Sequence, residues 1–184
     1  ITNPIPSDAV HTARPYLRDF DGTDPEGDTL LWSMSTNASW LSFGPANGTV
    51  WGLAPSTVGV FYVDMGLSDG FGGSASNNYT LSVGNVAPAI LNPIGTSTSM
   101  RRASVSIDFN ASDPESDTLS WSLRTNAAFL SVGAANGTVS GLTVNVPATY
   151  WVEVTVSDGF GGSDIVNFTL SVVNRPPQAF VTAP

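Results

Sequence analysis

Apolar and polar residues alternate along most of the chain with a period of two. The apolar positions of four such segments are Val105, Ile107 and Phe109; Leu119, Trp121 and Leu123; Tyr150, Val152, Val154 and Val156; and Phe168, Leu170 and Val172. A strand points successive side chains to opposite faces, so this alternation predicts antiparallel strands that bury one face. No segment convincingly shows the period of about 3.6 residues of an amphipathic helix, and the pattern therefore predicts an all-β protein.

The second half of the chain repeats the first half. A shift of about 89 residues, without gaps, carries Asp24-Pro25-Glu26 onto Asp113-Pro114-Glu115, and roughly half of the aligned positions are identical. The heptapeptide SDGFGGS occurs unchanged at residues 68–74 and at residues 157–163. We therefore predict two tandem domains, residues 1–87 and residues 88–177. Residues 178–184 align with the opening of a further copy, which predicts a linker, or the start of a further strand or arm.

Each copy places short strands at steady spacing between turn signals. Together with a length of about 90 residues, this predicts two tandem Greek-key β-sandwich domains of the immunoglobulin-like type. The heptapeptide is expected to connect the last two strands of each sandwich, with glycines at positive φ. Phe71 and Phe160 are expected to fold back over the core.

Four segments carry a resemblance to a known family. They are FDGTDPEGDTLLWS (residues 20–33), WLSF (residues 40–43), NGTVWG (residues 47–52) and SDGFGGS (residues 68–74). They resemble the dystroglycan-type cadherin-like repeats, and both copies match over nearly their full length. The resemblance implies a cadherin-like sandwich in a secreted or cell-surface protein. Such repeats serve as spacers, adhesive units and appendages of enzymes alike.

Composition excludes several classes of partner. The formal net charge is -9, with 15 acidic residues against 6 basic ones, all of them arginine. Such a chain repels phosphate backbones and anionic membrane surfaces, so nucleic acid is excluded as a partner. Polarity that comes from Ser, Thr, Asn and Gly rather than from charge favours secretion, and the absence of cysteine excludes disulfides. No apolar run is long enough to span a bilayer, so we expect no membrane insertion in this segment.

Acidic residues in two loops of each copy are candidate calcium ligands. They are Asp24, Glu26, Asp28 and Asp69 in the first copy, and Asp113, Glu115, Asp117 and Asp158 in the second. Calcium takes about six to eight oxygen ligands, and in this topology the two loops emerge at the same end of a sandwich. The alternative is that Asp-Pro-Glu is only a tight turn, in which Asp caps backbone amides and Pro supplies its fixed φ.

The cadherin resemblance limits the calcium prediction. Cadherins hold calcium between successive domains, with an acid-x-acid loop and a later acidic position from the downstream domain. The residues that match these positions are Asp24, Glu26 and Asp69 in the first copy, and Asp113, Glu115 and Asp158 in the second. The Asp-Arg-Glu motif and the acidic linker of the upstream domain are replaced here by LAPS (residues 53–56) and NVAP (residues 85–88). The resemblance therefore implies at most a single calcium ion at each junction.

Six Asn-x-Ser/Thr sequences, called sequons below, are candidate glycosylation sites. Their asparagines are Asn37, Asn47, Asn78, Asn110, Asn136 and Asn167. Asn78 alternates with Tyr79 and Leu81, so it should point outward from the last strand, where a glycan has room. Asn47-Gly48 and Asn136-Gly137 are also strong hairpin-turn dipeptides, which explains them without a glycan.

Three aromatic residues are expected on the surface: Trp51, Tyr62 and Trp151. The first two alternate with Val50, Phe61 and Val63, which take the core-facing positions. An aromatic ring exposed to water is unfavourable unless another group covers it. That group is a sugar, a neighbouring subunit, or loops or a glycan of the same chain.

The sequence predicts a protein that is not an enzyme. Its single histidine, His11, lies in an expected loop, Met100 takes its place in the second copy, and no Gly-x-Ser-x-Gly motif accompanies it. The leading hypothesis is an extracellular structural or adhesive module of a surface stalk, adhesin or polymerised filament. Its partners would be copies of itself, other surface proteins or glycans, and its cofactor calcium. The alternative is a carbohydrate-binding or spacer module of a secreted hydrolase, with the three rings as stacking platforms.

Overall fold

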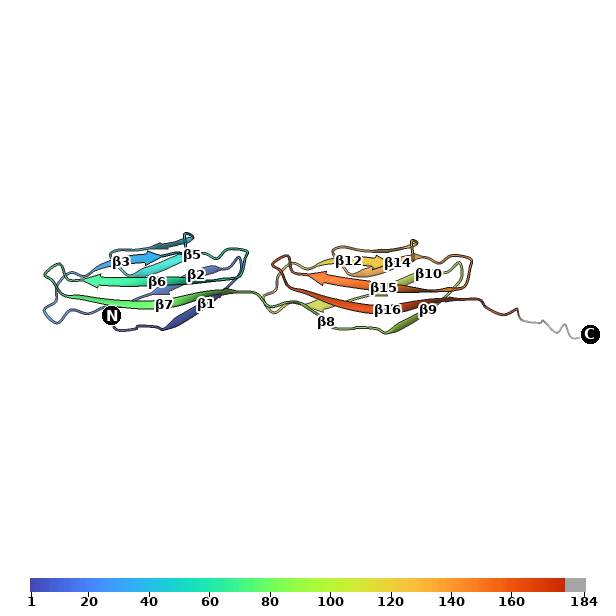
Figure 1. Ribbon diagram of the computed structural model, residues 1–184, viewed down its shortest axis with the longest axis horizontal. Helices are drawn as coiled ribbons and strands as arrows, with labels where there is room; N and C mark the ends of the chain where they lie inside the picture. Colours follow the sequence, from blue (N-terminus) through green and yellow to red (C-terminus); the bar gives the residue numbers. More distant parts are fainter. Residues whose placement is uncertain (178–184) are drawn as a thin grey trace, which may run out of the picture. The chain divides into compact units, whose positions relative to one another are not determined.

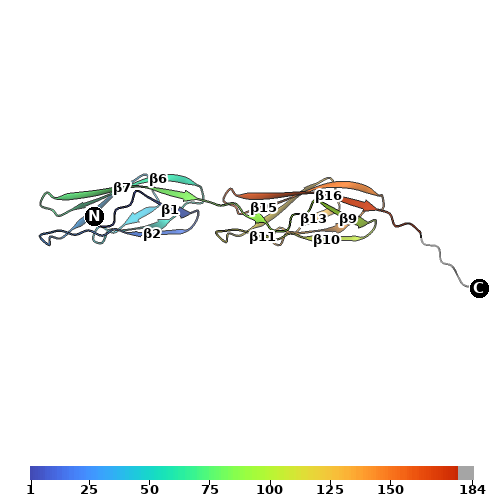
Figure 2. The ribbon, with the colours of Figure 1, turned by 90° about the horizontal axis from the view of Figure 1, so that it is seen from below.

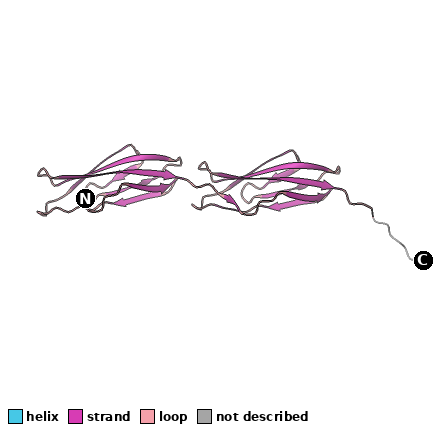
Figure 3. Ribbon diagram, turned by 60° about the horizontal axis from the view of Figure 1, so that its bottom comes forward, coloured by secondary structure: helices cyan, strands magenta, loops and turns pink. Residues whose placement is uncertain are grey.

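The computed structural model describes residues 1–177, which form strands and no helix (Figure 3). The chain divides into two compact units, unit 1 from Ile1 to Asn85 and unit 2 from Val86 onward. The all-β prediction is therefore confirmed. Within the described range, no helix is long and apolar enough to cross a membrane. The linker or arm predicted for residues 178–184 lies outside the described residues.

Unit 1 is a sandwich of two sheets (Figure 1). The larger sheet has the order β1 (Ser7–His11), β7 (Ser74–Gly84), β6 (Gly59–Ser68) and β3 (Leu31–Thr36), and the smaller has the order β2 (Pro15–Asp19), β5 (Thr49–Leu53) and β4 (Leu41–Phe43). β1 pairs with β7 in parallel, and all other neighbours are antiparallel. His11 is the last residue of β1, so its expected place in a loop was wrong: pairing with Gly84 keeps it in the strand.

Unit 2 repeats this arrangement with one addition (Figure 2). Its larger sheet has the order β12 (Ser120–Thr125), β15 (Ala148–Ser157), β16 (Ser163–Val173) and β9 (Thr96–Met100), and its smaller sheet β10 (Ser104–Asp108), β14 (Thr138–Leu142) and β13 (Leu130–Val132). A short extra pair joins β8 (Ala89–Ile90) to β11 (Ala111–Ser112).

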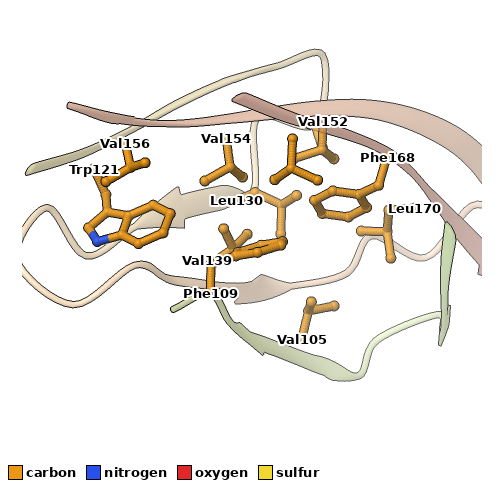
Figure 4. Close-up of a cluster of buried hydrophobic side chains, with 12 residues drawn as sticks. Val105, Phe109, Trp121, Leu130, Val139, Val152, Val154, Val156, Phe168 and Leu170 are labelled. Atoms are coloured by element: carbon orange, nitrogen blue, oxygen red, sulfur yellow. The ribbon is translucent and has the colours of Figure 1, made fainter. Parts of the chain in front are cut away.

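The core of each unit lies between its two sheets. In unit 2, Val152, Val154 and Val156 point inward from β15 and face Phe109 and Val139 (Figure 4). The predicted core positions are confirmed, because every apolar residue of the four alternating segments is buried or half-buried. The predicted core residues Val50, Phe61 and Val63 of unit 1 also face inward.

The same aromatic packing occurs in both cores. Phe20 lies 5.6 Å from Tyr79, ring centre to ring centre, and the equivalent Phe109 lies 5.9 Å from Phe168. Each phenylalanine also packs against the tryptophan of the facing sheet, Trp32 or Trp121. Each large ring buries about 150 to 250 Å², so this cluster contributes strongly to the stability of each unit.

The Asn-Gly turns confirm the hairpin prediction and explain their glycines. Gly48 and Gly137 have φ of 70° and 69°, a region that favours glycine. A Cβ atom on Gly137 would also lie 2.6 Å from the Phe109 carbonyl oxygen and 2.8 Å from the Trp121 ring. The turn therefore needs glycine both for its backbone conformation and for its contact with the core tryptophan.

The SDGFGGS segments connect β6 to β7 and β15 to β16, as predicted, with Gly70, Gly72 and their equivalents at positive φ. The expectation that Phe71 folds over the core was wrong, because its side chain is 84% exposed. Asp69 Oδ1 accepts hydrogen bonds from the Phe71 and Gly73 amides, so the loop is closed by its own aspartate and not by packing of the Phe71 ring. Phe160, in unit 2, is half-buried.

Candidate functional site

The Asp-Pro-Glu turns are closed by their first aspartate. Asp24 Oδ1 accepts hydrogen bonds from the amides of Glu26 (2.9 Å) and Asp28 (3.1 Å). Asp113 Oδ1 accepts the equivalent bonds from Glu115 (2.9 Å) and Asp117 (3.1 Å). The predicted capping of backbone amides is thus confirmed, and the turn has a structural role whether or not it binds an ion.

The same turns gather carboxylates. One oxygen from each of Asp24, Glu26 and Asp28 lies within 4.8 Å of the others, and the second copy groups Asp113, Glu115 and Asp117 in the same way. We call these groups the carboxylate triads. Three carboxylates this close repel one another unless a cation or proton compensates them.

The triad of unit 2 fits a hard cation. Asp113 Oδ2 is buried and accepts no hydrogen bond from the described residues, which leaves an anionic oxygen available to a ligand. Glu115 Oε2 accepts a hydrogen bond from the Val86 amide, so one of its oxygens already holds the start of the unit. Oxygen donors of this kind suit Ca²⁺, whose remaining ligands would have to be carbonyls or waters.

Asp69 and Asp158 lie outside the triads and cap the glycine-rich loops. Asp158 Oδ1 accepts hydrogen bonds from Phe160 (2.7 Å) and Gly162 (3.0 Å), and its side chain is only 3% exposed. In unit 1, Asp69 and Asp24 line one cavity of about 150 Å³. The capping role was missed from the sequence, although an aspartate followed by three glycines within four residues is a signal for it.

The three predicted surface aromatics are exposed. Trp51 is 44%, Tyr62 66% and Trp151 48% accessible to solvent. Trp51 lies on β5, in the smaller sheet of unit 1, whereas Tyr62 lies on β6, in the larger sheet. These two rings are therefore on different sheets and do not form a common platform.

Trp51 belongs to an apolar surface. Leu17, on β2, is directly opposite Trp51, and Leu53 follows two residues after Trp51 on the same face. Leu17 and Leu53 are 69% and 62% exposed. We call these three residues the apolar face of unit 1. Unit 2 has Ser106, Ser140 and Leu142 at the equivalent positions, so the fold itself does not require the first two apolar side chains.

All six sequon asparagines are exposed, but they differ in what they contact. Asn37 Oδ1 accepts a hydrogen bond from the Tyr62 amide at 2.8 Å. The side chains of Asn47 and Asn136 accept bonds from Thr49 and Thr138 within their turns. The remaining sequon asparagines are Asn78, Asn110 and Asn167, whose side chains make no hydrogen bond with the described part of the chain.

Residues 1–84 and residues 87–173 each match the model of a protein family described as "Putative Ig domain". The chain belongs to this Ig-domain family. The predicted tandem cadherin-like, immunoglobulin-like repeats are thereby confirmed. No curated protein matches the sequence of these Ig domains.

Solved structures similar to the tandem Ig domains include cadherins and titin. Human protocadherin-24 EC1-2 is 18% identical, with a TM-score of 0.41 over 92% of this chain and 95% of that chain. Drosophila N-cadherin EC1-4 is 17% identical, with a TM-score of 0.43 over 94% of this chain and 49% of that chain. The titin domains Z1Z2, in complex with telethonin, are 13% identical, with a TM-score of 0.49 over 95% and 96% of the two chains.

Proposed function

We propose that the two Ig domains form a structural or adhesive module outside the cell, as part of a surface stalk, adhesin or filament. Many cell-surface domains share the Ig-like sandwich, and the match of both units to an Ig-domain family supports this proposal. The proposal adds that a neighbouring copy of the protein is the partner, and that the apolar face of unit 1 is the contact.

The apolar face carries this proposal. Leu17, Trp51 and Leu53 are adjacent across two paired strands and exposed together, an arrangement that marks interaction surfaces more often than isolated apolar residues do. Covering one such side chain contributes about 1.5 to 3 kcal/mol. Three of them could offset much of the entropy lost on association, which amounts to at least about 4 kcal/mol.

The second copy supplies the variant that tests this contact. Leu17→Ser with Trp51→Ser gives unit 1 the residues of unit 2, so the fold should be kept. We expect the wild-type chain to associate with rising concentration in sedimentation velocity, and the double variant to remain monomeric. Leu142→Ser, which removes an exposed leucine from unit 2, is the matched control and should associate as the wild type does.

Two results would contradict the proposal. One is a wild-type chain that stays monomeric at every concentration, with or without calcium. The other is a double variant that associates as strongly as the wild type while its circular dichroism spectrum is unchanged. If the wild-type chain associates and the double variant does not, electron microscopy of native material would show whether the association builds a filament or a stalk.

We also propose that each carboxylate triad binds one Ca²⁺. Asp113, Glu115 and Asp117 would hold the ion in unit 2, and Asp24, Glu26 and Asp28 in unit 1. The ion would neutralise the clustered charge and stiffen the turn. The buried Oδ2 atom of Asp113 supports this assignment most directly, because a buried anionic oxygen without a hydrogen bond is costly.

A further inference from the structure

The outer faces of the two larger sheets carry the same four-residue arrangement. In unit 1, β6 and β7 place Tyr62 opposite Thr80 and Asp64 opposite Asn78. In unit 2, β15 and β16 place Trp151 opposite Thr169 and Glu153 opposite Asn167. Figure 1 shows the two strands of each pair side by side. In each unit, an exposed ring is therefore the diagonal neighbour of a sequon asparagine.

The spacing allows a group on the asparagine to reach the ring. Diagonal neighbours on one face of an antiparallel pair lie about 7 to 8 Å apart, which is within reach of a sugar residue attached to the asparagine. A cavity of about 370 Å³ lies between the two in unit 1, lined by Tyr62, Asp64 and Asn78 among others. A cavity of about 230 Å³ lies between Trp151 and Asn167 in unit 2.

The sequons at Asn78 and Asn167 stand out from the other four. Both are exposed in the middle of a strand, and neither side chain makes a hydrogen bond with the described residues. The threonine of each sequon projects from the same face, because it is two residues further along the strand. Both the amide nitrogen and the hydroxyl group are thus on the solvent side of the sheet.

The other sequons have a structural explanation or lack a counterpart. Asn37 holds the Tyr62 amide, and Asn126 holds the Trp151 amide in the same way without being part of a sequon. Asn47 and Asn136 are turn residues. Asn110 is replaced by Asp21 in the first copy. Only the pair beside the exposed rings repeats without such a role.

We propose that Asn78 and Asn167 carry N-linked glycans, and that the first sugars of each glycan lie over Tyr62 in unit 1 and over Trp151 in unit 2. A saccharide has apolar C–H faces that suit an aromatic ring and hydroxyl groups that suit the surrounding amides and carboxylates. The exposed rings are then covered by a modification of the chain itself. Trp51 has no sequon asparagine on a neighbouring strand, and the second copy has Ser140 at its position.

The chemistry needs an activated donor. The side-chain nitrogen of Asn78 forms a bond to the anomeric carbon of a phosphate-activated oligosaccharide on a lipid carrier. The bond between that carbon and the phosphate oxygen breaks, and the nitrogen loses one proton to a base of the transferase. This step rests on the extracellular route of the proposed function, because the transferase acts during secretion.

Occupancy is the first test. The chain is produced in a secretory host that attaches N-glycans, and glycopeptides are analysed by mass spectrometry. We expect Asn78 and Asn167 to be occupied. If both are empty in a host that occupies a reporter sequon, the proposal is wrong.

Coupling between glycan and ring is the second test. In glycosylated protein, Asn78→Gln should lower the thermal midpoint of unit 1 by about 2 to 5 °C. Tyr62→Ala should abolish that loss, whereas Trp51→Ala, an exposed ring on the other sheet, should leave it unchanged. Asn167→Gln and Trp151→Ala form the same cycle in unit 2. In unglycosylated protein from bacteria, the glutamine variants should have no effect.

Two outcomes would overturn the placement of the glycan. One is a midpoint loss for Asn78→Gln that is the same with and without Tyr62. The other is binding of the unglycosylated protein to an oligosaccharide array through Tyr62 or Trp151, which would assign the rings to a saccharide of another molecule. Sedimentation of unglycosylated protein tests the apolar face separately, so either proposal can fail alone.

Discussion

At the scale of single residues, a buried pair of tyrosines distinguishes unit 1 from unit 2. The hydroxyl groups of Tyr16 and Tyr79 lie 3.3 Å apart in the core of unit 1, and the Tyr16 hydroxyl donates to Asp8 Oδ2 at 3.0 Å. Burial raises the pKa of both tyrosines, and their contact and the charge of Asp8 raise the pKa of Tyr16 further. Unit 2 has Val105 and Phe168 at these positions and therefore lacks the pair.

These tyrosines predict that unit 1 is sensitive to alkali. In the unfolded chain the hydroxyls ionise near pH 10.0, whereas in the folded unit their raised pKa keeps them protonated. Stability is therefore complete below pH 10 and falls as the pH rises above it, by up to about 1.4 kcal/mol per pH unit for each hydroxyl. Thermal unfolding from pH 8 upward should show the unit 1 transition falling more steeply than that of unit 2.

The control is Tyr79→Phe, which adopts the residue of unit 2 at that position. It should reduce the alkaline loss of unit 1 while keeping the ring packing on Phe20. Equal losses in both units above pH 10 would contradict the role of the tyrosine pair.

At the scale of elements, four loops are closed by the same capping interaction. In each, Asp24, Asp69, Asp113 or Asp158 accepts two backbone amides through Oδ1 and so fixes the turn. This leaves the second oxygen of each aspartate for other contacts. Loop closure and ion binding are therefore compatible in one turn, because they use different oxygens of the same carboxylate.

The calcium proposal predicts a stabilised unit 2. Calcium at about one hundred times its dissociation constant would add about 2.7 kcal/mol, which corresponds to a rise of several degrees in the thermal midpoint. Asp113→Asn keeps the Oδ1 atom that caps the turn but removes the charge, so it should fold and lose this rise. Calorimetry with calcium and with chelator measures the thermal midpoint of the wild type and of the variant.

Asp108→Asn, an acidic residue outside the triad, is the matched control and should keep the response to calcium. A wild-type midpoint that is the same in calcium and in chelator would rule out a stabilising ion.

At the scale of the whole molecule, each unit has a core of its own. The two clusters of buried apolar residues share no member, and Phe20 and Phe109 are the largest fully buried side chains of their clusters. Each unit is therefore expected to fold around its own core.

Separate cores predict that each unit can be weakened alone. Phe109→Ala removes a ring that packs on Phe168 and Trp121, and it should cost unit 2 about 3 to 5 kcal/mol. Differential scanning calorimetry should show one transition lowered and the other unchanged. Phe20→Ala should give the mirror result, and a joint fall of both transitions would contradict separate cores.

The sequence by itself determined the strands, the core positions and the duplication. Alternation of apolar residues along a strand shows which face is buried, as it does for Val152, Val154 and Val156. This information is local, because it depends only on residues close in the sequence. The glycines of the Asn-Gly turns and the aspartates of the Asp-Pro-Glu turns could also be predicted, because positive φ and amide capping depend on neighbouring residues.

The expectation for Phe71 was wrong because Asp69 closes the loop without help from the phenylalanine ring. The loop of Asp158 has the same hydrogen bonds but a half-buried Phe160, so amide capping does not set the direction of the ring.

Only the tertiary structure decided which surface residues are neighbours. Strand order and register separate Trp51 from Tyr62, join Trp51 to Leu17, and place Asn78 diagonally from Tyr62. Pairing between distant strands determines these contacts, and no local pattern encodes the register. The residue types of the candidate sites were therefore visible in the sequence, whereas their grouping into an apolar face and into asparagine-ring pairs was not.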